Sequence, residues 1–231
     1  MHIIIFSDSL GRPRPDISQN ERTFYFDVYG SKLKNSLVSK HEVEHIYIES
    51  LDSQDAIFWS QRMVAFRSPE LVIFHLGIND CAPRIFKKGK KYLIFNPLFR
   101  KLTRDIFIKV ISKFRPFILK FFIKNRVYFK KKNFYSNFVS IKNEILKYSK
   151  NCKFLSIGIA QATEEYELKS PGIGSKIKSY NLILKNIFGD GFIDLNSILG
   201  GESKDYLISD NIHLTKESHH KIFKFLRDKI K

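Results

Sequence analysis

The sequence has 231 residues, of which 43% are hydrophobic and 27% are charged, as expected for a globular protein with one domain and a substantial core. Its two cysteines, Cys81 and Cys152, match neither a disulfide framework nor a metal-ligand cluster, which favours a reducing compartment. The net charge is +17, and the segment from Arg84 to Lys132 carries +16 of it, because 17 lysines and arginines there stand against one acid, Asp105. The rest of the chain is nearly neutral, so the basic character belongs to one segment.

The sequence contains no recognisable targeting or membrane-spanning segment. No basic and apolar signal sequence precedes the first predicted strand. A run of about 18 uncharged apolar residues, which a spanning helix needs, is also missing. We therefore expect a cytoplasmic protein.

The chain opens with an apolar, β-branched run over residues 3–6, which predicts a buried strand of a parallel sheet. The polar turn formers Ser7, Asp8 and Ser9 follow at once. Ligands of open α/β sheets bind at the carboxyl ends of the strands, so Ser9 is a candidate nucleophile. The alternative is that this turn only caps a helix.

Helices and strands then alternate along the chain. Strands are predicted over residues 43–48, 71–76, 154–159 and 192–195, and helices over residues 20–37, 53–63, 141–148, 173–188 and 216–230. Such alternation is typical of βαβ crossovers. It predicts an α/β fold, a three-layer α/β/α sandwich around a parallel sheet, formed as a single domain by residues 1–231.

Two further polar segments follow predicted elements. Asn79 and Asp80 come after the third strand, where we expect Asp80 to cap or orient the loop. Nearby Arg84 either clamps an anionic substrate group or simply belongs to the basic segment. Just before the last helix, Asp210 precedes His213 by three residues, a spacing that lets the carboxylate fold back onto the imidazole and orient a general base.

Taken together, Ser-Asp-Ser-Leu at the first strand end, Gly-x-Asn-Asp at a middle strand end and Asp-x-x-His-Leu near the carboxyl terminus resemble the SGNH (GDSL-type) hydrolase family. The match extends over nearly the whole chain and implies the flavodoxin-like fold of that family. It further implies that Ser9 is the nucleophile, His213 the base that activates it, and Asp210 the residue that orients His213.

The resemblance also implies an oxyanion hole. Its donors would be the backbone N–H of Ser9, the side-chain amide of Asn79 and a backbone N–H that the family takes from a glycine. Counting from the second strand, Ser53 is the best match for that glycine. A second departure from the family pattern is Ser7, which stands where the family usually has glycine.

The basic segment is interpreted as a helical insertion over residues 86–133. Within it, residues 98–132 interleave aromatic and aliphatic side chains with lysines and arginines, and Pro116 is expected to divide them into two helices. Such helices suit the surface of an anionic membrane. The insertion could instead pack on the body or on a second subunit, or bind a polyanion such as nucleic acid, which its high apolar content disfavours.

These observations lead to the hypothesis of a serine esterase that removes an acyl group, with O-acetyl as the preferred candidate, from a carbohydrate or lipid-linked glycan of a bacterial surface polysaccharide. It would act in the cytoplasm, peripheral to the inner membrane face, without a metal or other cofactor. The alternatives are an acyltransferase with the same Ser-His-Asp site and a non-catalytic protein that binds a membrane or polyanion. The sequence does not decide between them, and it leaves the oligomeric state open.

Overall fold

The fold is built around one parallel β-sheet. The computed structural model describes residues 1–86, 88, 104–123 and 126–230, with the backbone alone for residues 104–109 and 112. Five strands lie in the order β2-β1-β3-β4-β5. They are β1 (His2–Ser7), β2 (Glu42–Tyr47), β3 (Leu71–His75), β4 (Lys153–Ile157) and β5 (Phe192–Ile193). All neighbouring pairs are parallel, so the carboxyl ends of the strands meet at one edge.

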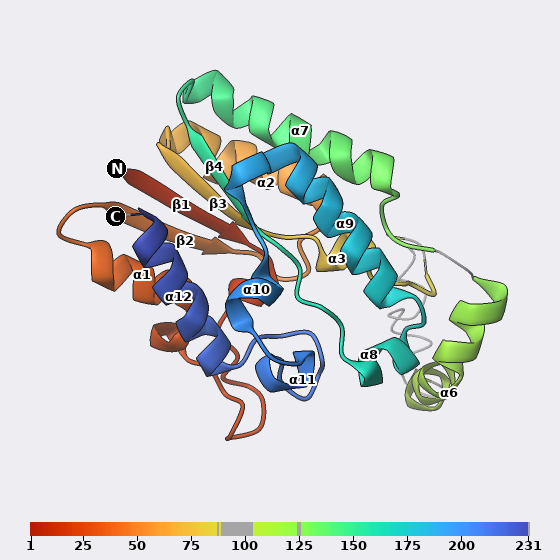
Figure 1. Cartoon of the computed structure of the whole chain (residues 1–231). Helices are drawn as coiled ribbons and strands as arrows, with labels where there is room; N and C mark the ends of the chain where they lie inside the picture. The colour runs from red at the N-terminus through yellow and green to blue at the C-terminus, as the bar shows by residue number, and fades with distance from the viewer. Residues whose placement is uncertain (87, 89–103, 124–125, 231) are drawn as a thin grey trace.

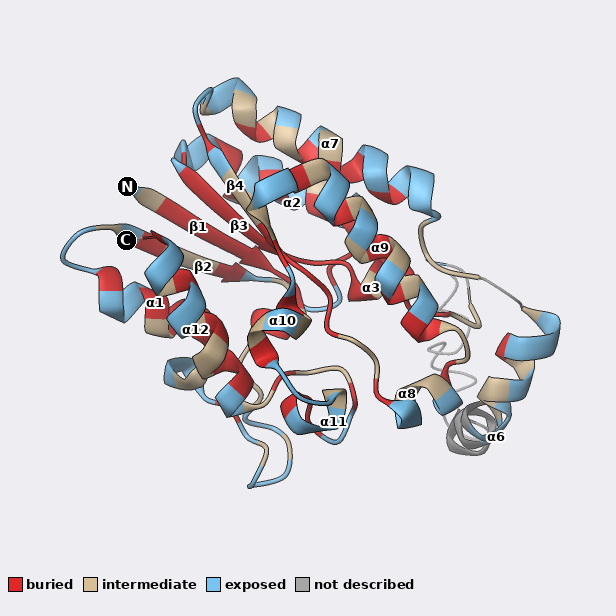
Figure 2. Cartoon of the chain, viewed as in Figure 1, coloured by how far each residue is buried: buried red, intermediate tan, exposed pale blue. Residues whose placement is uncertain are grey.

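Helices cover both faces of the sheet (Figure 1). On one face lie α2 (Ser53–Met63), α7 (Lys131–Tyr148) and α9 (Ile173–Phe188), and on the other lie α1 (Tyr29–Leu37) and α12 (Lys216–Ile230). Because strand side chains alternate, Ile4 and Phe6 pack against the first layer while Ile3 and Ile5 pack against the second. The central strands are buried on both sides (Figure 2), so the predicted three-layer sandwich is confirmed.

Short elements connect the layers. They are η1 (Ser9–Gly11), η2 (Tyr25–Asp27), η3 (Ala65–Arg67), α3 (Ile78–Cys81), α8 (Glu164–Lys169), η5 (Gly189–Gly191), α10 (Leu195–Leu199) and α11 (Ser203–Tyr206). Two of them, η1 and α3, directly follow the neighbouring strands β1 and β3. The loops that carry polar residues after these two strands therefore lie side by side.

The helix predicted over residues 20–37 is shorter than expected. Its first part instead forms a turn, a bridge residue and the short η2, because Arg14 and Thr23 form an antiparallel bridge with backbone hydrogen bonds of 2.9 and 3.2 Å. Phe24 is 42% exposed rather than buried, and α1 begins only at Tyr29. A contact between two loops thus replaces the first turns of the predicted helix.

The insertion forms α6 (Arg104–Phe117), followed by a π-helical turn, η4 (Ile118–Phe122). Pro116 lies inside the last turn of α6, and the helix type changes just after it instead of the chain breaking into two separate helices. Figure 1 shows α6 away from the sheet, beyond α3 and α8. The predicted amphipathic stretch includes residues 98–103 and 124–125, which lie outside the described residues. Across the described chain, none of the helices combines the length and apolar character needed to cross a membrane.

Candidate active site

Ser9 is presented by a tight turn at the end of β1. The preceding residue, Asp8, is the N-cap of η1, and its Oδ1 accepts a hydrogen bond of 2.8 Å from the backbone N–H of Leu10. The backbone N–H of Asp8 donates to the carbonyl of His75 at the end of β3, over 3.2 Å. Both sides of the turn are therefore held, and Ser9 lies on a rigid support.

His213 lies within hydrogen-bonding distance of Ser9 although 204 residues separate them. Its Nε2 is 3.0 Å from the Ser9 Oγ, and its Nδ1 is 2.6 Å from Oδ2 of Asp210. An ionised carboxylate can only accept, so Nδ1 carries the ring proton and Nε2 is left to accept the proton of the serine hydroxyl. The three side chains form the ordered relay that nucleophilic catalysis by serine requires.

The loop that carries His213 is closed by local hydrogen bonds. Oδ1 of Asp210 accepts from the backbone N–H groups of Ile212 and His213, both at 2.9 Å. Asn211 takes a left-handed conformation with φ of 64°, which asparagine tolerates better than most residues. The Asp-x-x-His spacing works because this turn brings the Asp210 carboxylate back over the imidazole.

Asp210 is ionised in this loop. Burial by itself would raise the pKa of its carboxyl group, but hydrogen bonds from the side chain and backbone of His213 outweigh burial and lower the pKa to about 2. Asp8 lies on the other side of Ser9 and behaves in the opposite way. Its complete burial raises its pKa to about 8, because the backbone hydrogen bonds from Leu10 and Gly77 do not compensate for the lost solvation.

The side-chain amide of Asn79 has only one consistent orientation. Its Nδ2 donates to the carbonyl of Leu51 over 3.0 Å, and its Oδ1 accepts from Nη2 of Arg84 over 3.2 Å. A carbonyl cannot donate and a guanidinium cannot accept, so turning the amide over would break both bonds. The second N–H of Nδ2 has no partner among the described residues and is available to a ligand.

Gly77 makes the loop around Asn79 possible. It precedes α3 with φ of 132°, a backbone conformation that L side chains rarely adopt. A Cβ there would also lie 2.8 Å from Cδ1 of Ile159. The glycine of the Gly-x-Asn-Asp segment is therefore required by the turn that presents Asn79.

Ser53, the predicted third oxyanion donor, is not brought to the site. It is fully buried, and its backbone N–H lies 3.1 Å from both carboxylate oxygens of Asp80. Its hydroxyl donates to Oδ1 of the same carboxylate over 2.6 Å. Ser53 and Asp80 instead tie the start of α2 to α3, and this contact stabilises the Asn79 loop.

Ser50 lies next to the candidate site, where Ser53 was expected. It lines the same pocket as Ser9 and Asn79, and its φ of 58° lies in the left-handed region that favours glycine. The sequence analysis placed the third donor at Ser53 by counting residues from the predicted strand, three positions after Ser50.

A pocket of about 190 Å³ opens over these groups. Its lining residues are Ser9, Arg14, Glu49, Ser50, Ile78, Asn79, Ala82, Arg84, Tyr166, Ile212 and His213. The lining includes apolar side chains as well as the candidate nucleophile, the candidate base and two guanidinium groups. A small acyl group fits this volume, which is below the range for drug-sized ligands.

Arg14 is a site residue that the sequence did not reveal. Its Nη1 lies 2.9 Å from both ring nitrogens of His213. Its Nη2 lies 4.0 Å from the carboxylate of Asp210. The bridge to Thr23, which replaced the predicted helix, is what holds Arg14 against the histidine.

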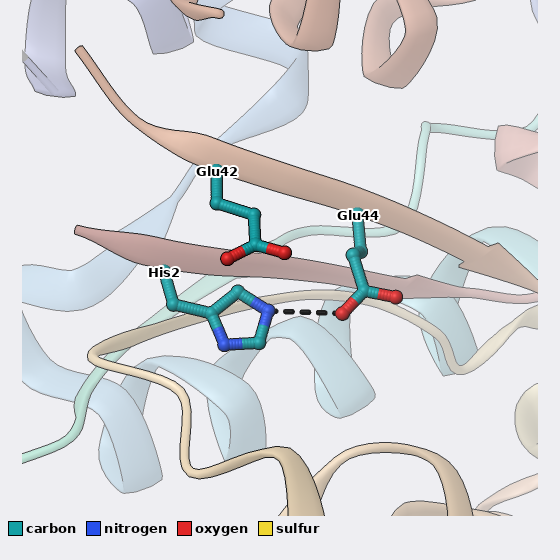
Figure 3. A group of neighbouring side chains, drawn as sticks. All are labelled: His2, Glu42 and Glu44. Carbon is teal, nitrogen blue, oxygen red and sulfur yellow. Dashed lines mark hydrogen bonds and ion pairs between the residues drawn. The ribbon is translucent and has the colours of Figure 1, made fainter.

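A second group of ionisable side chains lies at the opposite edge of the sheet, where β1 and β2 begin (Figure 3). Potential ligand atoms of His2, Glu42 and Glu44 lie within 4.8 Å of one another. Glu44 is already bound on both oxygens, by His2 over 2.9 Å and by Arg67. We assign no metal to this group, because both oxygens of Glu44 already have protein partners.

Comparison with known proteins agrees with the fold. No protein-family model matches the sequence, and no curated protein matches it. Among solved structures, a lipase/acylhydrolase from Enterococcus faecalis is similar over 99% of this chain and 94% of its own, with a TM-score of 0.66 and 14% identity. A catalytic mutant of Axe2, an acetylxylan esterase from Geobacillus stearothermophilus, is similar over 98% of this chain and 93% of its own, with a TM-score of 0.60 and 14% identity. TesA is similar over 100% of this chain and 98% of its own, with a TM-score of 0.62 and 13% identity. The chain therefore has the fold of the SGNH hydrolases, as its sequence motifs predicted.

Proposed function

We propose that the protein is a serine esterase that hydrolyses a short acyl ester, with O-acetyl on a carbohydrate as the preferred substrate class. The observation that carries the proposal is the relay from Ser9 through His213 to Asp210, with distances of 3.0 and 2.6 Å. Three similar folds are described as a lipase/acylhydrolase, an acetylxylan esterase and TesA, which supports ester chemistry.

In the proposed reaction, Oγ of Ser9 attacks the acyl carbonyl and its proton passes to Nε2 of His213. The imidazolium is stabilised by Asp210 and returns the proton to the leaving alcohol, which leaves an acyl group on Ser9. Water then attacks the acyl-enzyme with His213 again as base, and the products are a carboxylic acid and free Ser9. Each step uses one proton that the His213 imidazole can hold and return.

The negative charge that develops on the carbonyl oxygen needs donors placed in advance. We assign these to the backbone N–H of Ser9, the free N–H of the Asn79 amide and the backbone N–H of Ser50. Ser50 replaces Ser53 in this assignment, since the N–H of Ser53 is bound to Asp80.

The preference for a short acyl group rests on the size of the pocket. Its volume of about 190 Å³ leaves little room beyond a small acyl group and the atoms next to the ester. The carbohydrate part rests on the similarity to an acetylxylan esterase, which shares the fold at low identity. A bacterial surface polysaccharide or a lipid-linked precursor remains our proposed source of such esters.

A fluorophosphonate probe tests the enzyme proposal. We expect covalent labelling of the native chain, its loss in Ser9→Ala and a strong reduction in His213→Ala. Ser7→Ala is the matched control, since this serine is fully buried two residues away, and it should still be labelled. A folded native chain that is not labelled would instead favour the non-catalytic binding protein.

An acyltransferase with the same site is the nearest alternative. Release of acetate from acetylated xylo-oligosaccharides in water supports the esterase. Acetate transfer to an added sugar at the expense of hydrolysis would support the transferase.

The insertion is proposed to hold the enzyme at an anionic membrane surface. Four side chains at helical spacing on α6 and η4 are exposed, namely Val110 by 47%, Phe114 by 51%, Phe117 by 52% and Phe121 by 62%. A different position of α6 contacts the rest of the protein: the guanidinium of Arg115 donates to the carbonyl of Pro83 over 2.9 Å. An outward apolar stripe with neighbouring lysines suits the boundary between lipid headgroups and acyl chains.

Vesicle flotation tests this surface. We expect the chain to float with vesicles containing anionic phosphatidylglycerol and not with neutral phosphatidylcholine vesicles. The triple change of Phe114, Phe117 and Phe121 to Ser should abolish flotation, whereas Phe66→Ser, which changes a 57% exposed side chain elsewhere, should not. If the fraction of protein that floats depends neither on the lipid charge nor on the triple change, the result would instead favour packing against a second subunit or binding of a polyanion.

A further inference from the structure

Three arginines around the loop after α3 have no negative partner among the side chains that the structure describes. Across the described residues, the ion pairs between arginines and carboxylates are made by other arginines, namely Arg12, Arg14, Arg67 and Arg227. Arg84, Arg115 and Arg126 form none, and the only acid between Arg84 and Lys132 in the sequence is Asp105. Charged groups that leave water are normally paired, so this cluster is incomplete without an anion.

Neutral partners hold each of these guanidinium groups. Arg126 donates to the carbonyl of Ile85 over 2.7 Å, and Arg115 donates to the hydroxyl of Ser170 over 2.9 Å. Burial lowers the pKa of Arg115, and the neighbouring charge of Arg84 adds to that effect. The loop is therefore organised by hydrogen bonds that leave its positive charge uncompensated.

Arg84 connects this cluster to the reaction site. It lines the pocket over Ser9, and its guanidinium lies 4.7 Å from the centre of the Tyr128 ring. One bond from Nη2 goes to Asn79, while the Nε atom is buried with no partner within the described residues. A buried N–H without an acceptor is costly, and an anionic oxygen atom is the acceptor that would suit a guanidinium.

The remaining charges of the pocket wall do not neutralise Arg84. Glu49 is the one carboxylate among the described lining residues, and it pairs with Arg12 over 2.7 Å. Its side chain is 64% exposed, so it points largely to water. Arg14 adds a second guanidinium to the same lining.

We propose that this pocket selects esters that carry an anionic oxygen group, a carboxylate, phosphate or sulfate, close to the acylated oxygen, and that Arg84 binds this group. The inference rests on the proposed esterase function and names its substrate class. Because the same guanidinium holds the Asn79 amide, a bound anion also completes the hydrogen bonding around the oxyanion donor. Arg84 is thus a specificity residue for the anion and a positioning residue for Asn79.

The experiment compares matched charged and neutral esters. The kcat/KM values of 3- and 4-acetoxybenzoate are divided by those of their methyl esters, at constant ionic strength, in the native chain and in Arg84→Met. Comparing this ratio between variants cancels the intrinsic reactivity of the esters. We expect the ratio to fall roughly 10- to 100-fold in Arg84→Met, as for a lost hydrogen bond to a charged group. 4-Acetoxyphenyl phosphate, run in parallel, distinguishes a phosphate site from a carboxylate site.

Two variants separate binding by Arg84 from the general positive field. Arg84→Lys keeps the charge without the planar fork and should give an intermediate ratio. Arg126→Met removes one charge of the same cluster outside the pocket lining and should leave the ratio within about threefold of the native value, as expected for a screened charge. For the neutral esters, Arg84→Met should lower kcat more than it raises KM, since Asn79 loses a support that acts in the transition state.

The outcomes keep the two proposals apart. Hydrolysis of both esters with the same ratio in the native chain and Arg84→Met overturns the anion site and leaves the esterase intact. An equal loss of preference in Arg126→Met also overturns it, in favour of a diffuse field. If neither ester is hydrolysed and the fluorophosphonate probe does not label Ser9, the esterase proposal fails and the anion site fails with it.

Discussion

Two histidines at opposite edges of the sheet each contact a carboxylate, and only one of them is placed to do chemistry. His213 contacts Asp210 over 2.6 Å with one nitrogen and the hydroxyl of Ser9 over 3.0 Å with the other. His2 contacts Glu44 over 2.9 Å (Figure 3). Its other ring nitrogen lies 3.1 Å from the carbonyl oxygen of Arg67. The second partner decides the difference: a hydroxyl can donate a proton to the imidazole, whereas a carbonyl can only accept one.

The position in the fold explains why the partners differ. The amino ends of parallel strands begin next to each other with ordinary backbone turns, so the side chains there find carbonyls and surface charges. At the carboxyl ends, the loops after β1 and β3 and the loop before α12 converge on one point. That convergence supplies a nucleophile, a base and oxyanion donors within one pocket.

The largest expected effect separates the two histidines directly. His213→Gln should lower kcat for a short acetyl ester by roughly 10⁴- to 10⁶-fold, because the general base is lost. His2→Gln should leave kcat within about twofold, since His2 does not line the pocket over Ser9. Steady-state hydrolysis of 4-nitrophenyl acetate measures both. A large loss of kcat in His2→Gln would mean that the edge of the sheet where the strands begin affects catalysis at the edge where they end.

The next pair of changes tests the carboxylates. Asp210→Asn should lower kcat about 10⁴-fold, because an amide no longer holds the proton on Nδ1 of His213. Glu44→Gln, the matched change at the other edge, should preserve kcat and cost at most about 1 kcal/mol of unfolding free energy. Similar activity in Asp210→Asn and the native chain would contradict the assigned role of Asp210.

The oxyanion assignment predicts a smaller effect at Asn79. Asn79→Ala should lower kcat by roughly 10²- to 10³-fold with little change in KM, as expected for a donor that acts mainly in the transition state. Asn143→Ala, on an exposed position of α7, serves as the control. An equal rise in KM with unchanged kcat would instead assign Asn79 to binding of the ground state.

The smallest effect concerns stability and contrasts the two aspartates that flank the site. Burial raises the folded-state pKa of Asp8 from 3.8 to about 8, so the folded chain keeps a proton that the unfolded chain loses above pH 3.8. Asp8 therefore makes the unfolding free energy fall by about 1.4 kcal/mol per pH unit as the pH rises towards 8. Asp8→Asn should remove this slope and stabilise the protein most at pH 8.

Urea unfolding of the native chain and Asp8→Asn between pH 6 and 9 measures the slope. Asp210 has the opposite sign, because its pKa is lowered to about 2 and its favourable contribution is lost only as the pH falls below about 3.8. Asn143→Ala, at an exposed position of α7 without a titratable group, is the control and should change nothing in the pH dependence between pH 6 and 9. Parallel curves for Asp8→Asn and the native chain would show that Asp8 is ionised in the folded state.

The sequence alone determined the elements whose signals are local. The β-branched runs at residues 3–6 and 71–76 predicted the central strands, and the amphipathic period predicted α9 with its observed bounds of Ile173–Phe188. The same holds for the Asp-x-x-His turn, because Asp210 reaches its partner within three residues. Matching three such segments to one family was enough to predict the fold and to name Ser9, Asn79 and His213 as partners.

Tertiary structure decided what depends on contacts between distant loops. Thr23 pairs with Arg14 and thereby prevents the first turns of the helix that the local pattern favoured. The same pairing places Arg14 against His213. The backbone N–H of Ser53 donates to Asp80, and Ser50 instead of Ser53 lines the pocket with Ser9. These outcomes depend on which hydrogen-bonding groups find partners once the loops meet, and local residue preferences carry no information about that competition.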